Sequence, residues 1–176
     1  MKKSLFLFVF CLFTGVFAHA QGITTVLLDA TNHGSIQPIG GDGTRIFDDG
    51  SDGNYSAGID YWLTITGACS GPYKYVFTVE ELSIAQGDTM FIYDGPSTSS
   101  PLLWTATGIG GGLVEVSPET YEVFASPNNA AQALTVRLKT RNNSPTAGGF
   151  AILVGCKKPC ESVVPHIDSI YYKTRN

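Results

Sequence analysis

Apolar and polar residues alternate along this chain in short runs of strand length. In residues 134–139 every second position is apolar, so one face can meet a core while the other, which includes Thr135, meets water. Tyr75, Phe77 and Val79 can face a core in the same way. This period of two is typical of half-buried antiparallel strands, and no stretch of ten or more residues has helical spacing.

Turn residues separate the runs, for example at 94–96, 108–112 and 144–149. Many short strands without intervening helices predict an all-β fold, either a sandwich or a barrel. We expect strands at residues 24–28, 61–66, 73–79, 89–93, 113–116, 121–125, 134–139 and 150–154.

The first twenty residues have the pattern of a cleavable signal peptide. Two lysines precede an apolar run at 5–17, and Ala18 and Ala20 are small residues at the positions that a signal peptidase reads. The run is too short to span about 30 Å of hydrocarbon as a helix. We therefore expect cleavage before Gln21, secretion, and no membrane span in the mature chain.

Beyond the signal peptide we expect one domain at 21–157. The chain has 176 residues, and the character changes after Val154. Residues 158–176 are interpreted as a linker or as the start of a truncated following domain. The net charge of −4, without a cluster of Lys or Arg, argues against a nucleic-acid partner.

Export places the remaining cysteines, Cys69, Cys156 and Cys160, in an oxidising compartment, so we expect at least one disulfide. Cys156 could pair with Cys69, which would close a long loop, or with Cys160, which would close a short one. Three is an odd number, so one thiol stays free or pairs outside this chain.

Residues with catalytic chemistry are sparse. The mature chain has only His33 and His166, one near each end, and contains neither a Gly-x-Ser-x-Gly nor a His-Glu-x-x-His pattern. We interpret both histidines as surface residues and expect no enzymatic activity and no required cofactor.

The acidic, glycine-rich stretch at 47–56 has carboxylates that calcium could use, at Asp48, Asp49 and Asp52. It does not fit an EF-hand loop: counted from Asp48, the twelfth position is Ile59 instead of a bidentate Glu. Asp, Asn and Gly also form turns without a metal, and we favour that interpretation.

Several motifs occur in the order in which they occur in CUB domains. They are Phe-x-Asp at 47–49, Asn-Tyr at 54–55, Gly-Asp-Thr-Met-Phe-Ile-Tyr-Asp-Gly at 87–95 and Gly-Phe at 149–150. The chain resembles the CUB domain over about residues 44–156, particularly the CUB-like modules of bacterial multidomain surface proteins. The resemblance implies a two-sheet antiparallel, jelly-roll-like sandwich that binds proteins or glycans through its loops.

The resemblance also implies a position for the calcium site that many animal CUB domains have. Asp88 matches one of its acids, but Arg141 stands at the last acid and Ala85 at the Glu, with Glu80 and Glu81 as alternatives for the Glu. A guanidinium in place of a carboxylate inverts the charge of the site. We therefore expect no metal and a structural ion pair between Asp88 and Arg141.

The disulfides of the family are not reproduced either, since Asp60 or Tyr61 stands where its first cysteine is expected. The sequence therefore indicates a secreted, non-catalytic binding or adhesion module for protein or glycan ligands, and we expect it to be one piece of a longer protein. Alternatives are an ancillary domain of a secreted hydrolase, or a lectin-like domain in which aromatics such as Trp104 or Tyr73 stack on sugars.

Overall fold

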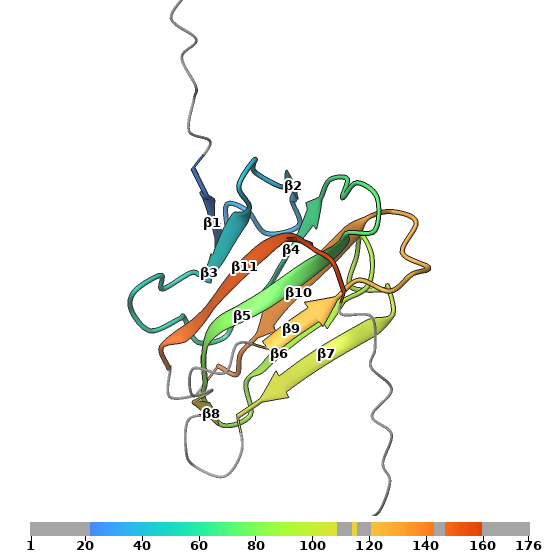
Figure 1. Cartoon of the computed structure of the whole chain (residues 1–176). Helices are drawn as coiled ribbons and strands as arrows, with labels where there is room; N and C mark the ends of the chain where they lie inside the picture. Colours follow the sequence, from blue (N-terminus) through green and yellow to red (C-terminus); the bar gives the residue numbers. More distant parts are fainter. Residues whose placement is uncertain (1–21, 109–113, 116–120, 143–146, 160–176) are drawn as a thin grey trace, which may run out of the picture.

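The computed structural model describes residues 22–108, 114–115, 121–142 and 147–159. Within these residues the chain forms eleven strands and no helix, and hence no helix able to cross a membrane. Two sheets stack face to face (Figure 1), which confirms the expected all-β sandwich. The expected signal peptide at 1–20, Cys160 and His166 lie outside the described residues, as does most of 158–176.

The strands divide between two sheets, called sheet A and sheet B below. Sheet A has the order β1 (Thr24–Leu28), β3 (Thr44–Asp48), β11 (Gly149–Lys157), β5 (Lys74–Ile84) and β8 (Val114–Glu115), and β9 (Tyr121–Phe124) also pairs with β5. Sheet B has the order β2 (Ile36–Pro38), β4 (Asp60–Thr66), β10 (Ala133–Lys139), β6 (Thr89–Tyr93) and β7 (Leu102–Thr107).

Two strand pairs depart from the expected antiparallel arrangement: β1 pairs with β3 in parallel, and so does β2 with β4. The cause is the path of the chain, which passes from β1 in sheet A to β2 in sheet B, back to β3 in sheet A and on to β4 in sheet B. Parallel neighbours need such a crossover, because a tight hairpin joins only antiparallel strands. The other described pairs in both sheets are antiparallel.

The core lies between the sheets, and an irregularity in β5 extends that strand's contribution to it. Val79 pairs with Ile152 and Glu81 pairs with Ala151, so Glu80 is an extra residue in the ladder. Such a bulge shifts the alternation by one position. The inward positions are therefore 75, 77 and 79 before the bulge and 82 and 84 after it, and all five are buried. Without the bulge, Leu82 and Ile84 would face solvent.

The expectation that Thr135 faces water is wrong. Thr135 is fully buried, although it lies on the outer face of β10. The loop between β6 and β7 folds over this face: Thr135 Oγ1 lies 2.7 Å from the carbonyl oxygen of Gly95, to which it donates, and 2.7 Å from Thr64 Oγ1. Thr64 in turn donates to the carbonyl oxygen of Pro96.

Most of the expected strands are present, β1 and β6 with the expected bounds. Of the expected strand at 113–116 the structure describes β8, Val114–Glu115. The sequence did not indicate β2, β3 or β7. In β3 the buried positions are Thr44, Ile46 and Asp48, so burial alternates along the strand. In the sequence, however, an Asp at the last of these positions indicates the beginning of a turn.

Candidate functional site

One end of the sandwich holds a buried carboxylate, Asp88, directly before β6. Its Oδ2 accepts a hydrogen bond from the Tyr55 hydroxyl at 2.8 Å, and its Oδ1 accepts one from the backbone N–H of Arg141 at 2.8 Å. The Tyr55 oxygen accepts from the backbone N–H of Ala85 at 2.8 Å. Burial raises the pKa of Tyr55, so the hydroxyl keeps its proton and can donate.

The side chain of Arg141 plays a smaller part at Asp88 than the sequence suggested. Its Nε lies 3.9 Å from Asp88 Oδ1, and 55% of the side chain is exposed. The guanidinium donates instead to the backbone carbonyl of Gln86. The hydrogen bonds to Asp88 therefore come from Tyr55 and from the Arg141 backbone, and the guanidinium meets the carboxylate only through this longer ion-pair contact.

The three positions considered for the Glu of a calcium site bring no carboxylate to Asp88. Ala85 contributes only its backbone N–H. Glu80 forms an ion pair with Arg45 on the outer face of sheet A, with 2.9 Å between Arg45 Nε and Glu80 Oε2. Glu81 is exposed beside the bulge. Within the described ranges, no group of three or more His, Cys, Asp or Glu residues is placed to hold a metal ion.

The acidic stretch at 47–56 forms a turn around Asp48, which is fully buried. Asp48 Oδ1 accepts from the N–H of Gly50 and Oδ2 from the N–H of Phe150, each at 2.8 Å. Burial raises the pKa of Asp48 to about 6, although these two hydrogen bonds act in the opposite direction. Asp49 accepts from the N–H of Ser56 at 3.1 Å, and Asp52 is exposed.

The outer face of sheet B carries an aromatic and cationic row, defined by Trp62, Arg137 and Phe91. Arg137 is the direct partner of Trp62 on β4 and of Phe91 on β6, so the three side chains lie side by side. The Arg137 Cζ lies 5.7 Å from the centroid of the Phe91 ring. None of the three belongs to the core cluster, and all are partly exposed.

Asp60 holds the guanidinium of the row in place. Its two oxygens accept from Arg137 Nε and Nη2 at 2.6 Å each. These hydrogen bonds hold the pKa of Asp60 below its usual value and raise the pKa of Arg137. This bidentate ion pair orients Arg137 between the two aromatic residues, which gives this face a defined shape.

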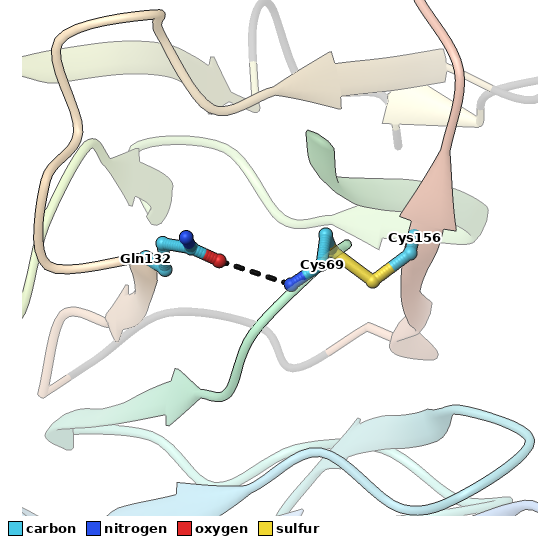
Figure 2. The surroundings of a disulfide bond; sticks show 3 residues. All are labelled: Cys69, Gln132 and Cys156. Carbon is cyan, nitrogen blue, oxygen red and sulfur yellow. Dashed lines mark hydrogen bonds between the residues drawn. A yellow bond between two sulfur atoms is a disulfide. The ribbon is translucent and has the colours of Figure 1, made fainter. Parts of the chain in front are cut away.

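The opposite end of the sandwich holds the disulfide, which joins Cys69 after β4 to Cys156 near the end of β11 (Figure 2). The Cα atoms are 5.7 Å apart, and 87 positions separate the residues. Of the two pairings considered, the long-loop bridge is therefore the one formed. The backbone N–H of Cys69 donates to the side-chain oxygen of Gln132 at 2.9 Å (Figure 2).

The remaining residues considered from the sequence have structural contacts. His33 Nδ1 accepts from the backbone N–H of Trp62 at 3.2 Å, and its ring lies 5.5 Å from that of Tyr61. Trp104 packs against the core, with its ring 6.4 Å from that of Tyr121. Tyr73, by contrast, is 46% exposed.

Sequence reasoning missed the aromatic and cationic row because its members come from three separate strands. Trp62 was part of an apolar run, and Phe91 was part of a family motif. The available signal was the alternation: once Leu63 and Ile92 are assigned to the core, Trp62 and Phe91 must point outward. Their pairing with Arg137 depends on the strand order, which no local pattern gives.

Two solved structures resemble this chain in fold. The CUB1-EGF-CUB2 domain of human MASP-1/3 matches with a TM-score of 0.50 and 15% identity, over 66% of this chain and 42% of that one. The CUB1-EGF-CUB2 domains of rat MASP-1 match with a TM-score of 0.49 and 14% identity, over 78% of this chain and 47% of that one. The chain thus spans less than half of either structure. No protein-family model and no curated protein matches its sequence.

Proposed function

Since the chain has the fold of a CUB domain, we propose that it is a non-catalytic binding module of an exported protein and recognises ligands at the cell surface. The observation that carries this proposal is the row of Trp62, Arg137 and Phe91 on the outer face of sheet B. Outer faces of antiparallel sheets are usually polar, whereas Trp and Arg are enriched among the residues that dominate binding energies.

The row suits a protein ligand. Its three side chains lie side by side and partly exposed on neighbouring strands, so a second protein surface can cover them together. Arg137 is oriented in advance by Asp60, so less side-chain entropy is lost on binding. The carboxylate and the guanidinium also offer a partner both signs of charge at the edge of the aromatic surface.

Cell binding by the exported chain tests this function. The fluorescently labelled wild type should bind the surface of the cells that export it, and Trp62→Ala and Arg137→Ala should each weaken binding about tenfold or more. Arg45→Ala is the matched control, because Arg45 also forms a bidentate ion pair on an outer sheet face, with Glu80. Thermal unfolding of each variant checks that it is folded.

A wild type that does not bind these cells would contradict the proposed function. If the Trp62 and Arg137 variants both bind as tightly as the wild type, the chain is still a binding module, but the outer face of sheet B is not its binding site. Loss of binding in Arg45→Ala as well would show that the effect is not specific to sheet B.

Export is part of the proposal and rests on residues 1–20 together with the disulfide. A bridge such as Cys69–Cys156 forms and persists in oxidising compartments. The intact mass of the secreted protein should correspond to a chain that begins at Gln21. A product that keeps residues 1–20 would contradict cleavage at this site.

The absence of catalysis is also a proposal. His33, the histidine that the structure describes, accepts a backbone hydrogen bond from Trp62 and so serves to position a loop. We expect no turnover of peptide or glycoside substrates by the purified chain. Turnover that a single substitution abolishes would show that a catalytic site is present.

A further inference from the structure

A polar hollow of about 220 Å³ lies beside the disulfide, at the end of the sandwich opposite Asp88. It is bordered by the loop after β4 and by the loop between β9 and β10. Its lining includes Tyr73, Lys74, Ser126, Asn129 and Gln132. A volume of this size suits a single small ring or side chain, since drug-sized ligands occupy about 300–1,000 Å³.

The walls of the hollow are held in place. The disulfide fixes one loop through Cys69, and the Gln132 side chain accepts from the Cys69 N–H at 2.9 Å. On the other loop, Asn129 Nδ2 donates to Asp94 Oδ1 at 2.7 Å and to the carbonyl oxygen of Ala133 at 2.6 Å. A cavity with fixed walls loses little conformational entropy when a ligand binds.

Gln132 is an unusual residue for its position. Its φ is 44°, in the left-handed region that favours glycine. A side chain here costs stability, so an observed outlier of this kind points to a role for the side chain. Its oxygen accepts from Cys69, while the amide nitrogen is turned away from Cys69 (Figure 2) and keeps the capacity to donate.

The charged side chain in the lining of the hollow is a cation, Lys74, while the neighbouring Asp94 carboxylate accepts hydrogen bonds from the lining residues Ser126 and Asn129. The chain has a net charge of −4, but the lining contains Lys74 and neither Asp nor Glu. Lys74 forms no ion pair among the described residues. The hollow therefore favours a ligand that brings a negative charge.

We propose that this hollow binds a sugar residue that carries a carboxylate. One face of a pyranose ring is lined by C–H groups and can stack on the exposed ring of Tyr73, while its hydroxyl rim accepts from the Gln132 amide and bonds to the Ser126 hydroxyl. The carboxylate pairs with the Lys74 ammonium. The proposal rests on the binding function above and adds a second site, at the disulfide end.

Isothermal titration calorimetry of the full exported chain tests the site with two probes. One is an oligosaccharide that ends in glucuronic acid, and the other is the same oligosaccharide ending in glucose. The wild type should bind the acidic probe about tenfold more tightly than the neutral one, and this preference should fall as the salt concentration rises. Lys74→Gln should make the two affinities equal.

Two further variants locate the binding. Tyr73→Ala should weaken binding of the acidic probe about tenfold, whereas Tyr121→Ala, which removes an equally exposed aromatic ring elsewhere (47% against 46%), should leave it unchanged. Gln132→Gly should also weaken binding while the protein stays folded, because glycine suits a φ of 44°.

Binding of neither probe by a wild type that still binds cells would overturn the sugar site and leave the proposed function intact. Probe binding that is unchanged in both Tyr73→Ala and Gln132→Gly would place the sugar elsewhere and overturn it as well. A wild type that binds neither cells nor probes would contradict both proposals.

Discussion

Asp48 and Gly149 depend on each other at the beginning of β11. Gly149 has a φ of 82°, and a Cβ built on it would overlap the Asp48 carboxylate, which accepts from the N–H of the next residue, Phe150. The closing Gly-Phe motif of the sequence thus has a physical reason. Only a residue without a side chain lets the carboxylate reach this N–H group.

Substitution of the two adjacent glycines should separate this effect from a general effect of alanine. Gly149→Ala should lower the free energy of unfolding by more than about 2 kcal/mol, through strain at positive φ and the lost contact with Asp48. Gly148→Ala should change it by no more than about 1 kcal/mol, because its Cβ would lie 3.6 Å from that of Ser83, an ordinary contact. Urea denaturation measures both, and equal losses would contradict this account.

Asp48 should also make stability depend on pH. Its pKa is about 6 in the folded protein, against 3.8 for an unperturbed Asp, so between these values the folded state binds the proton more tightly. The contribution of Asp48 to stability is therefore largest below about pH 4 and falls, by on the order of 3 kcal/mol, as the pH rises through 6.

The difference between wild type and Asp48→Asn isolates this contribution from the other carboxylates. Unfolding free energies measured from pH 4 to 7 should decline more steeply with pH in the wild type than in Asp48→Asn. Asp52→Asn, at an exposed position of the same turn, should keep the slope of the wild type. Parallel curves for wild type and Asp48→Asn would show that the carboxyl titrates normally.

At Asp88 the structure predicts an order of importance among its partners. Tyr55→Phe leaves Asp88 Oδ2 and the Ala85 N–H without their bonds and should cost about 1–3 kcal/mol. Arg141→Ala keeps the backbone bond to Oδ1 and removes an exposed guanidinium, so it should cost no more than about 1 kcal/mol.

Thermal unfolding of both variants, with and without calcium, measures this order. The wild type should unfold at the same temperature in either condition, in line with the prediction that no metal is required. A larger loss in Arg141→Ala than in Tyr55→Phe would restore the guanidinium as the main partner. A melting temperature that rises steeply with calcium would show that Asp88 belongs to a metal site.

Among the elements, β11 is the strand that joins the most distant parts of the chain. It lies between β3 and β5, and its end carries Cys156, bridged to Cys69 after β4 of the other sheet. In the chain-entropy model a bridge across 87 positions stabilises the folded state by about 4–5 kcal/mol. It restricts the unfolded chain more than any single contact in the core.

Removal of the bridge should be correspondingly costly. The double variant Cys69→Ala, Cys156→Ala should lose about 2–5 kcal/mol of unfolding free energy in urea. Cys160→Ala should leave stability unchanged and serves as the control, and non-reducing peptide mapping should find the 69–156 pair in it. A double variant as stable as the wild type would contradict the stabilising role of the bridge.

The strands differ in how far sequence alone determines them. Alternation predicts which face of β10 and of the first half of β5 meets the core, as at Tyr75, Phe77 and Val79. It does not predict that Val76 and Thr78, on the opposite face of β5, are also buried. It does not predict that Thr135 is buried, since the loop that covers it joins two other strands. Nor does it predict the bulge at Glu80, which is a feature of the pairing between β5 and β11.

For the whole molecule, the sequence gives the fold class and a framework of motifs, but the sites arise from contacts across the fold. Tyr55, Ala85, Asp88 and Arg141 meet because three loops converge at one end of the sandwich. The motifs placed Asp88 and Arg141 together but gave no indication that Tyr55 would be the side-chain donor. At the other end, Tyr73 and Gln132 line one hollow from two loops that only the tertiary fold brings together.

The position of the disulfide also determines how the molecule responds to a pulling force. If the described chain is stretched from Gly22 and Pro159, tension passes directly from Cys156 to Cys69 through the sulfur atoms. The intervening chain, about 300 Å long when extended at roughly 3.3–3.6 Å per residue, carries no load and cannot lengthen while the bridge is intact. Mechanical extension is then limited to the segments outside the bridge, chiefly β1 to β4, and a reductant would release the remaining length in single-molecule force measurements.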